Sequence, residues 1–194
     1  MRPVGSALVG PNAVTQLHAA MCAAGRYALM ERVFAAAGHQ EWLSSAPEAM
    51  IPEAAAADVH RQGWRLANPA DAAHLAADAG RRTADYVMEN RIPAPVRALL
   101  SVLPGMLSEP LLLSAIARHG WTFAGSGDVR ILRGGDAALE IRPNPLAGPF
   151  GCVWHMAVFT AMWQRFVHPE AQVVETACCS SGAPACRFAV LRPI

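Results

Sequence analysis

The chain has 194 residues, of which 53% are hydrophobic, and a formal net charge of +1 at pH 7. This length is enough for one domain with its own core, and basic residues that are scattered rather than grouped argue against nucleic acid as a partner. All sixteen basic residues are arginine, so Schiff-base chemistry on a lysine and a phosphate loop of the Walker type are excluded.

Residues 11–119 are predicted to be mainly helical. Apolar residues recur three and four positions apart in alanine-rich stretches, which prolines and glycines separate. Asn12 is the candidate N-cap of the first helix and Gly25 its candidate end. The predicted helices cover residues 12–25, 26–37, 52–66, 70–89, 95–102 and 108–119.

After His119 the pattern becomes that of strands and turns. Short apolar runs are separated by the turn sequences GSGD and RGGD. A long helix is predicted over residues 148–169, because apolar side chains return there to helical spacing. The predicted strands are WTFAG, DVRIL and ALEIRP before that helix, and QVVETAC and CRFAVLR after it.

These elements predict an α+β fold, with N-terminal helices followed by an antiparallel sheet and a long helix before the last two strands. We expect a single domain over residues 1–194. Its mainly helical part is 1–119, and 120–194 holds the sheet, the long helix and a metal site. No apolar run reaches the roughly 20 residues of a membrane span. The N-terminal residues show no signal-peptide pattern, so we expect a cytoplasmic protein.

The stretch ETACCSSGAPACRF holds three of the five cysteines. In a reducing compartment such a cluster favours metal ligands over disulfides. If the long helix packs back on the sheet, Cys152 in its first turn meets Glu175, Cys178 and Cys186. Three thiolates and one carboxylate suit a closed, structural zinc site. Cys179 points the opposite way on an extended chain and is expected to be a buried small hydrophobe, or else to replace Cys178.

This C-terminal motif resembles that of the 4-vinyl reductase domain family. The shared pattern is C-x22-E-x2-C-x3-G-x3-C-x-F, matched by Cys152, Glu175, Cys178, Gly182, Cys186 and Phe188. The resemblance implies that the three cysteines and the glutamate hold zinc, as in aromatic-sensing domains of bacterial regulators. It also implies a ligand-binding fold shared with vesicle-tethering subunits that enclose an acyl channel.

Three more stretches narrow the resemblance. GPNAVTQL, MIPE and AGRRTADYVMENRIP look like the branch of that family that is named for 4-vinyl (8-vinyl) reduction in bacteriochlorophyll biosynthesis. With them the resemblance covers nearly the whole chain. It implies a tetrapyrrole as ligand and the enzymes of this pathway as partners.

The residues leave open whether the chain is an enzyme. Vinyl reduction needs a hydride source such as NADPH, but the glycine-rich segment GSGDVR lacks the third glycine of a dinucleotide site and precedes a strand. An iron–sulfur cluster on the cysteines would need the glutamate as one ligand.

We therefore consider three hypotheses for the function of the chain. The first is a carrier that presents a Mg-porphyrin or protochlorophyllide intermediate to biosynthetic enzymes. A divinyl (proto)chlorophyllide 8-vinyl reductase that uses NADPH comes second. A dimerising protein-interaction module without pigment comes third. We expect at most peripheral membrane contact.

Four residues are candidates for tetrapyrrole binding: His119, Trp121, Trp154 and His155. A neutral imidazole can ligate magnesium, and indole rings suit an apolar slot. The alternatives are that His155 is a core histidine near the metal site and that His119 is a helix C-terminal residue favoured by the dipole. For both histidines we prefer this structural interpretation to a role in tetrapyrrole binding.

Arginines of the AGRRTADYVMENRIP stretch are a second candidate for ligand binding. Arg81, Arg82 or Arg91 could meet a pigment carboxylate. The preferred alternative is a solvated helix face on which they pair with acids at helical spacing, such as Asp78.

Overall fold

The computed structural model of the protein describes residues 7–132 and 139–191. The helices of this part are α1 (Asn12–Ala23), α2 (Tyr27–Ala36), α3 (Glu53–Leu66), α4 (Pro69–Asn90), α5 (Ala94–Val102), α6 (Gly105–His119), α7 (Trp121–Ala124) and α8 (Pro149–Phe166), with 3-10 turns η1 (Gln40–Leu43) and η2 (Cys179–Ser181). The strands are β1 (Leu8–Val9), β2 (Ile51–Pro52), β3 (Asp128–Ile131), β4 (Leu139–Arg142), β5 (Gln172–Ala177) and β6 (Cys186–Leu191). The predicted α+β fold is confirmed.

The six predicted helices of the first part are all present, with small shifts at their ends. α1 ends as expected at Gly25, whose φ of 66° is left-handed. The N–H groups of Gly25 and Arg26 donate to the carbonyls of Cys22 and Met21 and close the helix. The predicted cap at the other end is wrong: Asn12 is already helical, Pro11 occupies the cap position, and no side chain caps the helix.

The segment WTFAG was predicted as a strand and is the short helix α7 instead. The N–H groups of Phe123 and Ala124 both donate to the carbonyl of Gly120, at 3.0 and 2.8 Å, so the chain continues to turn after α6. Four residues of alternating pattern are too few to distinguish a strand from one helical turn. GSGD therefore joins a helix to β3, and the predicted turn RGGD lies outside the described residues.

The main sheet has the strand order β3-β4-β6-β5, and each neighbouring pair is antiparallel. A second small pair, β1 with β2, joins two loops of the helical part. The sequence did not predict this pair, because two-residue strands leave no periodic pattern.

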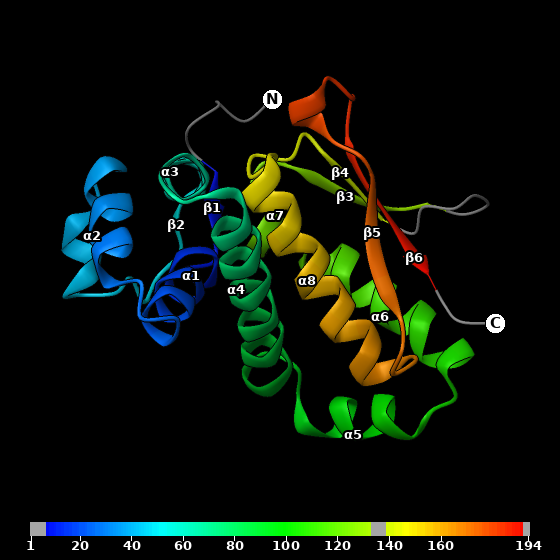
Figure 1. Cartoon of the computed structure of the whole chain (residues 1–194). Coiled ribbons are helices and arrows are strands. Elements are labelled where there is room, and N and C mark those ends of the chain that lie inside the picture. Colours follow the sequence, from blue (N-terminus) through cyan, green and yellow to red (C-terminus); the bar gives the residue numbers. More distant parts are fainter. Residues whose placement is uncertain (1–6, 133–138, 192–194) are drawn as a thin grey trace.

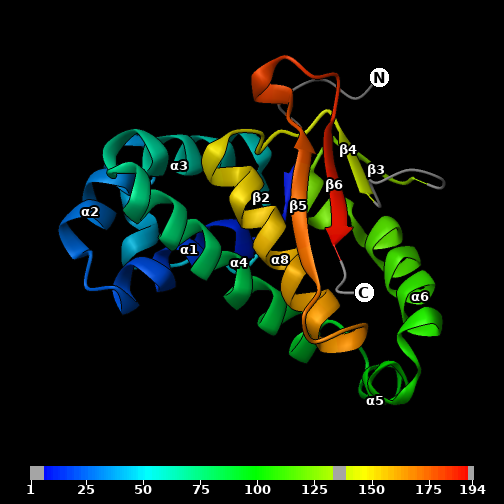
Figure 2. The same ribbon diagram turned by 45° about the vertical axis from the view of Figure 1, so that its right-hand side comes forward.

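Helix α8 lies between the sheet and α4 (Figures 1 and 2). It is apolar on most of its circumference and buries Trp154, Phe159 and Trp163 completely. Gly80 of α4 permits the closest approach of the two helices, since a Cβ there would lie 2.5 Å from the carbonyl oxygen of Trp154. On its other side α8 packs on β5, so its first turn lies next to the end of β5 and the start of β6. Within residues 7–132 and 139–191, no helix is long and apolar enough to cross a bilayer.

Candidate metal centre

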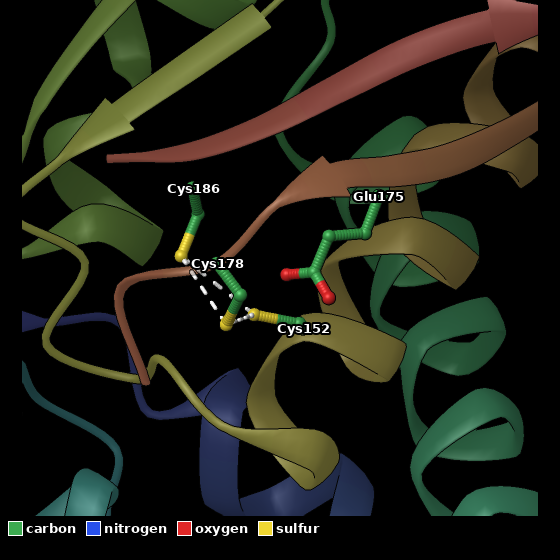
Figure 3. Close-up of side chains that lie close together, drawn as sticks. All are labelled: Cys152, Glu175, Cys178 and Cys186. Carbon is green, nitrogen blue, oxygen red and sulfur yellow. Dashed lines mark hydrogen bonds between the residues drawn. The ribbon is translucent and has the colours of Figure 1, made fainter. Parts of the chain in front are cut away.

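The four predicted metal ligands lie together at one end of α8. Cys152 is in the first turn of that helix, Glu175 is on β5, Cys178 follows β5, and Cys186 begins β6. Their ligand atoms all lie within 4.8 Å of one another (Figure 3). The three Sγ–Sγ distances are 3.4, 3.8 and 3.9 Å. Tetrahedral zinc with bonds of about 2.3 Å separates its sulfurs by about 3.8 Å, so the spacing agrees with such a site.

A β-bulge puts Glu175 and Cys178 on the same side of the chain. Glu175 pairs with Phe188 and Ala177 pairs with Arg187, so β5 carries one extra residue between the two pairs. In a regular strand, residues three apart face opposite ways. The extra residue reverses this alternation, which allows both side chains to reach the site.

The loop between the last two sulfurs is held by its own backbone. The carbonyl of Cys178 accepts the N–H groups of Ser181 and Ala183, both at 3.1 Å. Gly182 has a φ of 88°, a left-handed conformation that a residue with a side chain rarely adopts. This tight turn returns the chain so that Cys186 lies beside Cys178.

Two polar groups contact the sulfurs. The N–H of Cys179 donates to Cys186 Sγ at 3.3 Å, and Ser180 Oγ lies 3.0 Å from Cys178 Sγ. A hydrogen bond from the Cys152 thiol is the main cause that lowers the pKa of Cys186 to about 5. The same bond, with burial and the neighbouring Glu175, raises the pKa of Cys152. The site therefore favours the thiolate form of Cys186 and disfavours that of Cys152.

The carboxylate of Glu175 is the fourth member of the cluster. Figure 3 shows it facing Cys152. Its buried Oε1 has no hydrogen-bond partner in the described part of the chain. A buried carboxylate oxygen beside sulfur atoms is costly unless a cation or a donor compensates it. These four residues could hold a metal ion, and the donor set of three sulfurs and one oxygen is one that zinc accepts.

Cys179 lies outside this cluster. Its side chain is half-buried and packs against the hydrophobic core, rather than being fully buried as expected. Burial raises the pKa of its thiol. Its backbone N–H, not its sulfur, is directed to Cys186.

The described side chains among the four residues proposed for pigment binding do not lie together on an open surface. Trp154 and His155 are neighbours in the core, 1% and 0% exposed. Trp154 Nε1 donates to Thr83 Oγ1 at 3.2 Å, and His155 Nδ1 donates to the Gly151 carbonyl at 2.8 Å. His119 is exposed at the end of α6. Trp121 begins α7, and its side chain is outside what the structure describes. Their role in ligand binding stays a prediction.

The structure draws attention to a histidine that the sequence analysis did not select. His60 of α3 is 3% exposed and its Nε2 donates to the Ala13 carbonyl at 2.8 Å, while its buried Nδ1 has no partner among the described residues. Burial lowers the pKa of His60 to about 4. His60 and Trp64, four positions apart, line a cavity of about 220 Å³ with Phe150 and Ser180. The only sign of this cavity in the sequence was the spacing of His60 and Trp64, four positions apart, in an alanine-rich helix.

Two of the arginines form the expected ion pairs on the surface of α4. Arg81 and Arg82 bind Asp78 at 3.4 and 2.7 Å, three and four positions away. This confirms the helix-face interpretation for both. The guanidinium of Arg91 lies 5.9 Å from the ring centre of Tyr86.

The glycine-rich segment GSGD binds a carboxylate of the protein itself. Ser126 donates from its backbone N–H and its hydroxyl to the two carboxylate oxygens of Glu53, at 2.6 and 2.9 Å. Gly125 has a φ of 57°, and a Cβ there would meet that carboxylate. The GSGD segment thus forms a turn around the carboxylate at the start of α3, and its N–H and hydroxyl donors bind the protein itself.

Comparison with known proteins gives two close relatives. The bacteriochlorophyll synthase 23 kDa chain of Cereibacter sphaeroides is 43% identical over 190 residues, which cover 94% of this chain and 90% of the relative. The protein of the same name from Rhodobacter capsulatus is 35% identical over 189 residues, which cover 95% and 87%. No protein-family model and no solved structure matches, so the resemblance to the 4-vinyl reductase domain family stays a prediction.

Proposed function

Because this chain belongs to the family of the bacteriochlorophyll synthase 23 kDa chains, we propose that it acts in bacteriochlorophyll biosynthesis as a tetrapyrrole-binding protein. It would hold a Mg-porphyrin or protochlorophyllide intermediate and present it to the enzymes of the pathway. The observation that supports the pathway is the extent of the similarity, 43% identity over 94% of the chain, which goes far beyond the cysteine motif. We take residues 1–194 to be a single domain of the 4-vinyl reductase type.

We propose that Cys152, Glu175, Cys178 and Cys186 hold one zinc ion with a structural role. Four protein ligands fill a tetrahedral shell and leave no position for water or substrate. Bound zinc would neutralise the buried negative charge and fix the first turn of α8 to the ends of β5 and β6. The contribution of this chain is then a rigid frame beside the pigment site, with no chemistry at the metal.

Two features support a carrier over the alternative of an NADPH-dependent 8-vinyl reductase. In the GSGDVR segment the Ser126 N–H and hydroxyl donate to Glu53 and the Gly127 N–H donates to the Ala124 carbonyl, so these donors bind the protein itself rather than a pyrophosphate. The cysteine cluster includes a carboxylate, which suits zinc better than an iron–sulfur cluster.

The cavity beside the metal centre is the candidate entry for the pigment. It is lined by the indole of Trp64 and the ring of Phe150, which suit a flat apolar macrocycle, and by Arg61, which suits a carboxylate. At about 220 Å³ it is smaller than the roughly 300 Å³ at which pockets for drug-sized ligands begin. The site would therefore take one edge of the macrocycle, or widen as the pigment binds.

Anaerobic titration with Mg-protoporphyrin and with divinyl protochlorophyllide, with and without NADPH, tests the proposal. We expect a saturable shift of the pigment absorption bands and recovery of the pigment unchanged. Conversion to the monovinyl product would identify a reductase, and the absence of any shift would favour the interaction module.

A pair of tryptophan variants tests the place of binding. Trp64→Leu should weaken binding, whereas Trp42→Leu, at a half-buried tryptophan stacked on His39 away from the cavity, should leave it unchanged. Equal affinities for both variants would exclude the cavity.

A further inference from the structure

Large exposed apolar side chains gather on α5 and α6. Of the nine such side chains in residues 7–132 and 139–191, six fall between positions 96 and 111. We call this set the α5–α6 apolar surface. Its members are Val96, Leu99, Val102, Met106, Leu107 and Leu111.

These side chains lie at an edge of the molecule. Figures 1 and 2 show α5 away from the sheet, joined to the rest through the ends of α4, α6 and α8. Leu100 is the one buried residue of α5, although the helix is mostly apolar. Val102 and Met106, on either side of the turn between the two helices, are 79% and 80% exposed. Isolated exposed apolar residues are ordinary, but six large ones within sixteen positions of two consecutive helices indicate an interaction surface.

The two helices are held in a fixed arrangement. Ser108 Oγ donates to the carbonyls of Leu100 and Leu103, at 3.2 and 3.3 Å, which ties the start of α6 to the end of α5. Gly105 lies so close to the Val167 carbonyl that a Cβ would not fit there. The surface is therefore presented by two consecutive helices that are tied together at the turn between them.

The exposed charges of residues 91–119 are positive, and one exposed acid, Glu89, precedes this segment at the end of α4. Arg91 and Arg118 are exposed at the two ends of the segment. The one acid in residues 91–119 is Glu109, which is half-buried and accepts a hydrogen bond from Trp163 Nε1 at 3.0 Å. Arg97 donates to the carbonyls at the end of α4. An apolar helical face whose own exposed charges are arginines complements an anionic lipid surface.

We propose that the α5–α6 apolar surface docks on an anionic lipid bilayer. The six apolar side chains would enter the boundary between headgroups and acyl chains, and the arginines would meet the lipid phosphates. The chain would lie on the membrane and not cross it. This proposal does not depend on pigment binding.

Cosedimentation of the whole protein with pigment-free vesicles tests the proposal. Vesicles of phosphatidylcholine and phosphatidylglycerol in equal parts should bind the protein, and vesicles of phosphatidylcholine alone should bind it less. The double variant Val102→Asp/Met106→Glu should lower the partition coefficient by roughly tenfold for each side chain withdrawn from the lipid. Tyr27→Asp, which removes another exposed apolar side chain from the far end of the molecule, is the matched control and should bind as wild type.

The arginines and the fold are checked separately. Arg91→Gln/Arg118→Gln should reduce the dependence of binding on salt and on phosphatidylglycerol. Because the substituted side chains are exposed, all variants should keep the wild-type melting temperature. Absence of wild-type binding to anionic vesicles, or equal binding by Val102→Asp/Met106→Glu, would overturn the proposal. A dimer in sedimentation that this double variant dissociates, without vesicle binding, would assign the surface to a second copy instead. The pigment titration is unaffected by either result.

Discussion

The contact between α4 and α8 gives a sharp test of the architecture through Gly80→Ala. A Cβ on Gly80 would lie 2.5 Å from the Trp154 oxygen, 2.6 Å from Ala157 Cβ and 3.2 Å from the Val158 nitrogen. These three atoms belong to the backbone of α8 or are fixed to it, so no side-chain rotation can relieve the clash. The helices must separate, and the hydrogen bond from Trp154 to Thr83 is strained with them.

The change in the free energy of unfolding is the sum of one favourable and two unfavourable contributions. Alanine in the middle of a helix gains about 1 kcal/mol over glycine. Overpacking costs about 1–3 kcal/mol, and loss of a buried hydrogen bond adds about 1 kcal/mol or more. We expect a net loss of about 1–3 kcal/mol, which lowers the melting temperature by a few to roughly ten degrees in a protein of this size.

Thermal and denaturant unfolding of the variant, followed by circular dichroism, measures this loss. Gly63→Ala on α3 is the matched control, because the atoms nearest to its Cβ, at 3.0 Å and more, belong to the outer edge of the Phe150 ring and not to the backbone. The control should stay within about 1 kcal/mol of wild type. If Gly80→Ala were as stable as the wild-type protein, α4 and α8 would not be packed as described.

Two further predictions concern the metal ligands and the buried histidines. Cys178→Ser and Cys186→Ser should lose bound metal and lower the melting temperature, because metal binding contributes directly to folding. Cys179→Ser should retain its metal, and elemental analysis of the three variants measures the difference. If Cys179→Ser lost metal and Cys178→Ser kept it, the roles of these two neighbouring cysteines would be exchanged. Burial lowers the pKa of His60 to about 4 and that of His155 to about 3, so the unfolded chain, with a pKa near 6.5, binds more protons, and stability falls as the pH drops below 6.5. Each histidine should lower the free energy of unfolding by about 2 kcal/mol at about pH 5 relative to neutral pH. The free energies of unfolding of His60→Gln at the two pH values should therefore differ less than those of the wild-type protein. An unchanged difference would mean that His60 is not buried in its neutral form.

The sequence predicted the long elements well, because α4 and α8 have apolar patterns many turns long. It failed where local hydrogen bonds decided the outcome. The WTFAG segment became helical because the Gly120 carbonyl takes two N–H groups in succession. The pairing of β1 with β2 and the Glu53–Ser126 contact join segments far apart in the chain, and no local pattern signals them.

The candidate metal centre could be predicted from the sequence only in part. The types and spacing of its residues indicated a metal before any geometry was known. Regular strand alternation, however, would have placed Glu175 and Cys178 on opposite faces. The bulge between Glu175 and Ala177 brings them to one side, and a bulge has no signature in this stretch of sequence. His60 was missed because a buried histidine on an alanine-rich helix looks like any other polar position.

X-ray absorption at the zinc edge, together with elemental analysis of the protein as purified, tests the central claim most directly, since we propose that the metal site is closed and does no chemistry. We predict one zinc per chain with three sulfur neighbours at about 2.3 Å and one oxygen at about 2.0–2.2 Å, and with no further ligand. A fourth sulfur, an open position occupied by water, or iron and sulfide in place of zinc would contradict this account of the site.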